Sequence, residues 1–274
     1  MKKILNFIRS NSLQLVQIFM ICLVFIFIYH INLKIIFEDY LNTTILSPDN
    51  FWIILSLKQS RIVVALIVSI CILLYFRKNN KECCMNEKNY YHNYWYAWYW
   101  FCSNILGIKK CNLIRVPIFL QFKLVSNKTF DEFIFDDNDF PKVENERESE
   151  TLIFNKDKKG KEINLILEDT YKLNVSQLPL EKKNLYTIKI SRNFNNDVSR
   201  HFSLKFIDSI SKAVVNLKDV ERVNIFATTN PKNTYYIANK VFLLGDRGNI
   251  SHLYVYQQES FGDRNFERDG YKIY

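Results

Sequence analysis

Polar side chains follow the strands predicted in the last hundred residues, at the points where those strands end. Thr229 or Asn230 can cap a helix that begins at Pro231, and the exposed amides at a helix start attract phosphate. Arg192, followed by Asn193, ends a neighbouring strand, where its guanidinium can form a paired bond to a phosphate oxygen. The other two strands are followed by residues 168–171 and 257–258. A Thr-Asn-Pro cap and a single Arg also occur as ordinary structural features, but their convergence on one sheet edge predicts a site for a phosphorylated ligand.

The sequence shows little sign of catalysis. The phosphate-cradling and hydrolytic motifs GxGxxG, GxxxxGK[ST], GxSxG and HExxH are missing. His201 and His252 have no nucleophile or orienting acid visible in the sequence, so packing or capping explains them better than catalysis. Glu168 and Asp169 are adjacent in an extended stretch and point to opposite faces. We therefore expect that the protein is not an enzyme.

The six cysteines do not predict a metal site. They stand at positions 22, 71, 83, 84, 102 and 111, which contain neither a CxxC spacing nor a Cys/His pair at helical distance. We expect reduced thiols, with no metal and no cofactor.

A parallel sheet is the element that brings the strand ends together. Strand-like apolar runs occupy residues 163–168, 186–191, 222–228 and 251–257, and helical patterns occupy residues 198–217 and 231–244. Strands that alternate with helices at these lengths predict right-handed crossovers and a Rossmann-like α/β half-domain. Sheets of this kind bind ligands at the carboxyl ends of their strands.

The chain ahead of this sheet predicts a strand-rich insertion. Residues 112–125 suit a strand or a bent pair of strands broken at Pro117. Residues 136–162 form a charged tract, which predicts a solvated loop or hairpin with one short strand at residues 151–154.

Two apolar runs near the N-terminus predict a membrane helical hairpin. Residues 18–29 are unbroken apolar and residues 62–76 contain a single Ser, so we place the spans at about 13–33 and 55–76. A signal peptide is the alternative for the first run, but no small-x-small cleavage site follows it. Lys and Arg precede the first span and follow the second, which predicts a multi-pass membrane protein with both termini in the cytoplasm.

The charge distribution argues against a duplex-binding protein. Residues 1–81 hold nine Lys or Arg and three acidic residues, which is +6 of the formal net charge of +9. This charge surrounds the apolar runs, where it reports membrane orientation rather than a nucleic-acid surface, so we expect no direct DNA binding.

An aromatic juxtamembrane segment, residues 82–111, separates the membrane region, residues 1–81, from the cytosolic domain, residues 112–274. Residues 90–101 contain nine aromatic side chains in twelve positions. Tyr and Trp favour the membrane interface, so this stretch predicts an in-plane collar under the bilayer. A helix packed against the soluble domain is an equal alternative, and an aromatic cage for a base is a third.

Four polar residues lie within or beside the predicted spans, Gln14, Gln17, Lys58 and Arg61. Isolated polar side chains in a span face an unfavourable desolvation, which is relieved if they line a wet lumen between assembled hairpins. Their alternative is to reach the head groups at the ends of the helices.

Residues from about 163 to 258 resemble the C-terminal half of the SAVED sensor domains of bacterial CBASS antiphage systems, which are related to CARF domains. The stretches that carry the resemblance are INLILEDTYKLNVSQLP, LYTIKISR and VNIFATTNPKNTYYIANKVFLLGDRGNISHLYVYQQ. Two apolar helices ahead of such a module resemble the two-transmembrane effectors of CBASS.

The resemblance implies a prokaryotic inner-membrane effector of antiviral defence that is controlled by a cyclic di- or trinucleotide and disrupts the membrane as a homo-oligomer. It also implies a cyclic-nucleotide synthase encoded nearby. The ligand-edge candidates that it carries over are Thr170, Arg192, Thr229, Asn230 and Gln257. A full SAVED domain has two CARF-like halves, whereas residues 105–162 are short and charged, which leaves open a pocket completed by a second subunit.

Two other functions stay open at the level of sequence. A membrane-anchored enzyme acting on a nucleotide needs a base or metal ligand among Glu168, Asp169, Asp197 and His201. A structural anchor that recruits a partner would use residues 90–101 and the acidic tract as its docking surface.

Overall fold

The structure, a computed structural model, describes residues 2–30, 51–136, 138–142, 146, 148–192, 200–217, 219–245, 250–259 and 262–274. The chain divides into two compact units. The membrane unit comprises Met1–Cys83 and Phe101–Lys109, and the sheet unit comprises Cys84–Trp100 and Lys110–Tyr274.

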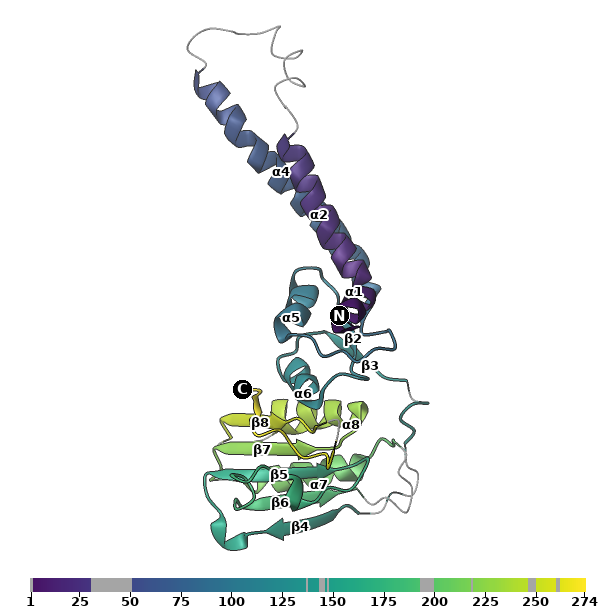
Figure 1. Cartoon of the computed structure of the whole chain (residues 1–274), viewed down its shortest axis with the longest axis vertical. Coiled ribbons are helices and arrows are strands. Elements are labelled where there is room, and N and C mark those ends of the chain that lie inside the picture. Colours follow the sequence, from purple (N-terminus) through teal and green to yellow (C-terminus); the bar gives the residue numbers. More distant parts are fainter. Residues whose placement is uncertain are drawn as a thin grey trace. The chain divides into compact units, whose positions relative to one another are not determined.

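Apolar helices make up most of the membrane unit (Figure 1). They are α1 at Lys2–Ser10, α2 at Ser12–His30 and α4 at Phe51–Asn79, which runs into the 3-10 turn η2 at Asn80–Glu82. Two stretches are long and apolar enough to cross a membrane, Ser12–His30 and Arg61–Glu82, and few of their residues are buried. This confirms the predicted pair of apolar helices. Residues 31–33 of the first predicted span lie outside the described residues.

A short parallel sheet opens the sheet unit. Its strands are β1 at Cys84–Met85, β2 at Lys110–Asn112 and β3 at Glu132–Ile134, in that order. Helix α5 at Tyr96–Asn104 lies between β1 and β2 in the sequence, and α6 at Ile118–Ser126 lies between β2 and β3.

Helix α6 corrects the prediction of strands at residues 112–125. Only Lys110–Asn112 is extended, and the apolar run that follows is helical. Pro117 stands at the N-cap, where the missing N–H of a proline costs no helical hydrogen bond, so it marks a helix start rather than a strand break. Leu120, Phe122, Leu124 and Val125 are buried, and Phe122 packs edge-on against Phe242 at 6.3 Å.

The larger sheet has the order β4-β6-β5-β7-β8-β9 (Figure 1). Its strands are β4 at Glu150–Phe154, β5 at Glu162–Glu168, β6 at Thr187–Ser191, β7 at Arg222–Ala227, β8 at His252–Tyr256 and β9 at Tyr271–Lys272. The four inner strands are parallel, and the edge strands β4 and β9 are antiparallel to their neighbours. This confirms the predicted α/β sheet.

Helices connect the parallel strands. Helix α7 at Leu204–Val215 joins β6 to β7, and α8 at Pro231–Tyr236, which continues as a π-helix at Ile237–Leu243, joins β7 to β8. Two 3-10 turns, Lys156–Lys158 and Val175–Gln177, flank β5. Every residue of β5 after Glu162 is buried, so both faces of the central strands are covered, as parallel sheets require.

Candidate functional site

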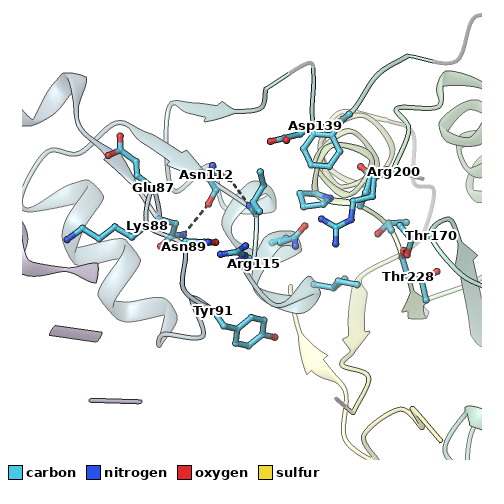
Figure 2. A pocket seen from close by; sticks show the side chains of 18 of the residues that line it. Glu87, Lys88, Asn89, Tyr91, Asn112, Arg115, Asp139, Thr170, Arg200 and Thr228 are labelled. Atoms are coloured by element: carbon cyan, nitrogen blue, oxygen red, sulfur yellow. Dashed lines mark hydrogen bonds between the residues drawn. The ribbon is translucent and has the colours of Figure 1, made fainter. Parts of the chain in front are cut away.

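A cavity in the sheet unit has a volume of about 810 Å³. One wall comes from the ends of β5 and β7, with Thr170, Tyr171 and residues 228–231. The opposite wall comes from residues 86–89 and 91, which precede α5, and from residues 112, 114, 115, 118 and 121, which follow it (Figure 2). Ligand sites of α/β proteins lie at this edge of the sheet, outside the carboxyl ends of the strands.

Hydroxyl groups shape the sheet wall of the cavity. Thr170 Oγ1 donates to the carbonyl oxygen of Thr228 at 2.6 Å, and Thr228 Oγ1 donates to that of Tyr171 at 3.1 Å. Thr229 Oγ1 and Thr234 Oγ1 are 2.7 Å apart and share a hydrogen bond. These bonds tie the loop after β5 to the loop after β7, so the wall is preformed.

A buried carboxylate lies behind this wall. Asp169 Oδ2 accepts hydrogen bonds from Asn230 N, Asn230 Nδ2 and Asn233 Nδ2, each at 2.9 Å. Asp169 Oδ1 accepts one from Arg192 Nε at 2.7 Å. Burial raises the pKa of Asp169, whereas the Asn230 amide and the charge of Arg192 lower it. The start of α8, where the sequence predicts a phosphate, is therefore capped by an internal carboxylate.

The six residues predicted to contact the ligand do not all reach the cavity. Thr170, Thr229 and Asn230 line it. Arg192 does not; its side chain is 5% exposed and is held by Asp169. Gln257 also lies off the lining, where its Nε2 donates to the carbonyl oxygen of Gln258 at 3.2 Å. Asn193 lies outside the described residues.

Two arginines that the sequence analysis did not select line the cavity, Arg115 on the wall after β2 and Arg200 before α7 (Figure 2). Among the described residues, neither guanidinium makes an ion pair or a side-chain hydrogen bond. Lys88 lines the same space, as do the carboxylates of Glu87 and Asp139. Unpaired guanidinium groups in a concave site are the groups that bind phosphate best, so this cavity is suited to an anionic ligand that also offers hydrogen-bond donors.

The aromatic segment positions Arg115. The His92 backbone N–H donates to the Arg115 carbonyl oxygen at 2.9 Å, and the His92 ring bridges Lys88 O at 2.9 Å and the Tyr94 hydroxyl at 3.0 Å. Burial lowers the pKa of His92, and the charge of Arg115 adds to this effect. Only Tyr91 of the segment 90–101 lines the cavity, and the stretch from Tyr96 onward is helix α5.

The polar residues of the spans have different surroundings. Gln17 is buried and forms two hydrogen bonds with Asn80, at 2.8 and 2.9 Å. Gln14 is also buried, and Arg61 is partly buried. The side chain of Lys58 lies outside the described residues. Within the described parts of the chain, no group of three or more His, Cys, Asp or Glu is placed to hold a metal ion.

Comparisons with known proteins add the following. The whole chain, residues 1–274, matches the family described as the SMODS- and Ubiquitin system-associated 2TM effector domain. Two solved structures of an Acinetobacter baumannii Cap4 SAVED/CARF-domain containing receptor, with the cyclic trinucleotides 3′3′3′-cAAA and 2′3′3′-cAAA, align at a TM-score of 0.42 and 10% identity. Each alignment covers 61% of this chain and 39% of the receptor. No curated protein matches the chain.

Proposed function

The chain belongs to the SMODS- and ubiquitin system-associated 2TM effector family, and on this premise we propose that it is a membrane effector of antiviral defence that is controlled by a cyclic oligonucleotide. The nucleotide binds in the 810 Å³ cavity of the sheet unit, and its binding changes the assembly of the two membrane helices. The protein acts without catalysis, as a homo-oligomer that permeabilises the inner membrane. A synthase encoded nearby supplies the nucleotide.

The observation that carries this proposal is the pair of arginines on the cavity that have no ion-pair partner among the described residues. Arg115 and Arg200 offer two separate cationic groups, which suits a ligand with more than one phosphate. Glu87, Asp139 and Asn89 line the same cavity. The two carboxylates can accept hydrogen bonds from the edges of bases, and the Asn89 amide can accept or donate them. The resemblance of residues 163–258 to nucleotide sensors supports the same ligand class.

Two of the carboxylates that the enzyme alternative would use, Glu168 and Asp169, are already engaged, and the third, Asp197, lies outside the described residues. Glu168 Oε2 pairs with Lys189 Nζ at 2.7 Å and accepts the Leu173 N–H, and Asp169 is surrounded by four donors. Groups held in this way serve as structural anchors rather than as a general base. This favours a receptor over the nucleotide-processing enzyme.

Titration of the full chain in liposomes tests the proposal. We expect one or more of cyclic di-AMP, cyclic di-GMP, cyclic AMP–GMP and cyclic tri-AMP to bind in calorimetry and to change the release of an entrapped dye. Arg115→Ala and Arg200→Ala should each weaken binding by about 10- to 100-fold, since a hydrogen bond to a charged group contributes roughly 1.5–3 kcal/mol. Arg268→Ala, whose exposed side chain pairs with Glu181, is the control. Wild-type protein that binds none of the four nucleotides would refute the proposal.

Assembly and topology follow from separate measurements. Chemical crosslinking in membranes should give oligomers of the full chain, and a monomer under all conditions would exclude the assembly. Reporter fusions should place both termini in the cytoplasm, as the distribution of Lys and Arg predicts.

A further inference from the structure

We propose that helix α5 transmits ligand binding from the cavity to the membrane helices, with Asn86 and Tyr99 as positioning residues at one end and Arg77 and Asn80 at the other. This inference rests on the proposed function, since it describes how the same cavity controls the same helices. It is carried by hydrogen bonds within each unit and by the fact that one helix contributes residues to both.

The cavity wall is attached to the first half of α5. Asn86, which lines the cavity, donates through Nδ2 to the Tyr99 hydroxyl at 3.3 Å and to the Asn112 carbonyl oxygen at 3.2 Å. The Tyr99 hydroxyl donates to the His92 carbonyl oxygen at 3.1 Å. Tyr99 is fully buried, and its ring stacks on Tyr94 at 5.8 Å. A shift of the wall on ligand binding therefore has a direct route to the helix.

Helix α5 crosses from one unit to the other without a break. Its residues up to Trp100 belong to the sheet unit, and those from Phe101 belong to the membrane unit. The helix ends at Asn104 in a hydrogen-bonded turn, in which the backbone N–H groups of Ile105 and Leu106 both donate to the Phe101 carbonyl oxygen. Because the nine residues of α5 share one run of helical hydrogen bonds, we infer that a displacement of one end is passed along the helix to the other.

The far end of α5 is attached to the base of the membrane helices. Arg77 of α4 donates to the carbonyl oxygens of Asn104 and Ile105, where a cation interacts favourably with the helix C-terminus. Asn80 Nδ2 donates to the Leu106 carbonyl oxygen at 2.7 Å. The side chain of Asn80 also pairs with that of Gln17, so one residue joins α2, the end of α4 and the segment after α5.

The position of Asn80 makes this junction sensitive to displacement. Asn80 is 1% exposed, and each of its broken hydrogen bonds would leave a buried polar group without a partner. A displacement that breaks these hydrogen bonds is therefore costly, which makes the geometry of the junction responsive to a shift of α5. A ligand changes its state only by binding the cavity more tightly in one of the two arrangements.

Hydrogen exchange of the full chain in lipid nanodiscs tests the coupling without any ligand. In Asn80→Leu, the amides of residues 101–108 should exchange about tenfold faster, and the acceleration should extend to residues 96–100 and to the cavity wall at residues 86–92. Arg77→Met should act in the same direction. Asn79→Leu and Lys78→Met, at exposed neighbouring positions, are the matched controls and should leave these segments unchanged. Acceleration confined to residues 77–83 and 101–108 would overturn the proposal.

A second measurement separates transmission from binding. With whichever of the four cyclic nucleotides binds the wild type, Asn80→Leu and Arg77→Met should keep an affinity within about threefold while the ligand-dependent change in dye release falls at least tenfold. A release response equal to that of the wild type would overturn the inference and leave the proposed function intact. If no nucleotide binds the wild type, the proposed function fails, and the exchange experiment still decides whether α5 couples the cavity wall to the membrane helices.

Discussion

The ion pair of Asp169 and Arg192 allows a sharp test of how the candidate site is built. In Arg192→Met, the fully buried carboxylate of Asp169 keeps its three Asn donors but loses its only paired cation among the described residues. In Asp169→Asn, the guanidinium of Arg192 loses the carboxylate that pairs with it, and it stays buried because the Arg192 side chain is only 5% exposed. Removing one partner of a buried ion pair costs about 3–5 kcal/mol, so each single variant should lower the unfolding midpoint of the sheet unit by about 10 °C.

The double variant Asp169→Asn/Arg192→Met distinguishes the effect of losing the ion pair from the effect of a general loss of packing. Because no buried charge is left uncompensated, its midpoint should fall no further than that of either single variant. Thermal unfolding of the full chain in detergent, followed by intrinsic fluorescence, measures all four members of the cycle. Lys161→Met is the control, since its ion pair with Glu221 is exposed and surface pairs contribute little.

Two results would refute this reasoning. The first is a double variant whose destabilisation equals the sum of the two single variants, which would mean that the charges do not interact. The second is an Arg192→Met protein of wild-type stability that has lost nucleotide binding, which is the outcome expected if Arg192 contacted the ligand directly. The structure instead predicts that Arg192→Met lowers the stability of the protein, and that any loss of nucleotide binding accompanies this loss of stability.

Two further predictions concern the cavity wall and the base of the membrane helices. Burial lowers the pKa of His92 in the folded protein, so the unfolded chain binds the proton more tightly. The stability that this histidine contributes is therefore present above about pH 6.5, the pKa of an unperturbed histidine, and is lost as the pH falls towards the lower pKa of the folded state. His92→Gln should therefore lose less thermal stability than the wild type between about pH 7.5 and pH 5.5, and an equal loss would contradict the assignment. Gly107 has a φ of +78°, and a Cβ there would lie 3.1 Å from three atoms of Arg77, so Gly107→Ala should lower the thermal midpoint by several degrees. Gly262→Ala shares the positive φ but has open space around it, so an effect as large as that of Gly107→Ala would exclude the contact with Arg77 as the cause.

The parts of the fold that the sequence predicts well are those with a strong period. The buried strands β5 and β7 each carry one pattern over their whole length, and the structure places them within one residue of the expected bounds. The amphipathic helix α7 is also found, but it begins at Leu204, six residues after its predicted start. Helix α6 was predicted wrongly because six of its nine residues are apolar and they follow a run of apolar residues that looks like a strand. A short apolar run has the same appearance as a buried strand, and only the place of Pro117 distinguishes the two.

The candidate site was only partly predictable for a different reason. Thr170, Thr229 and Asn230 follow strands, and strand ends can be located along the chain. Arg115 lies in a turn with a φ of +61°, and Arg200 precedes α7, so no periodic pattern signals that either lines a cavity. The role of Asp169 depends on donors about 60 residues away in the sequence, at Asn230 and Asn233, and such long-range pairing has no local signature.

The order of the strands has a consequence for how the protein is made. The central strand β5 is bordered by β6 and β7, both of which come later in the sequence, and the sheet is completed only by β9 at Tyr271–Lys272. The helices of residues 2–82 leave the ribosome long before any of these partners exist. Under the proposed function, these helices therefore enter the bilayer before the sheet that holds the cavity is complete, and each newly made copy is anchored before it can bind its ligand.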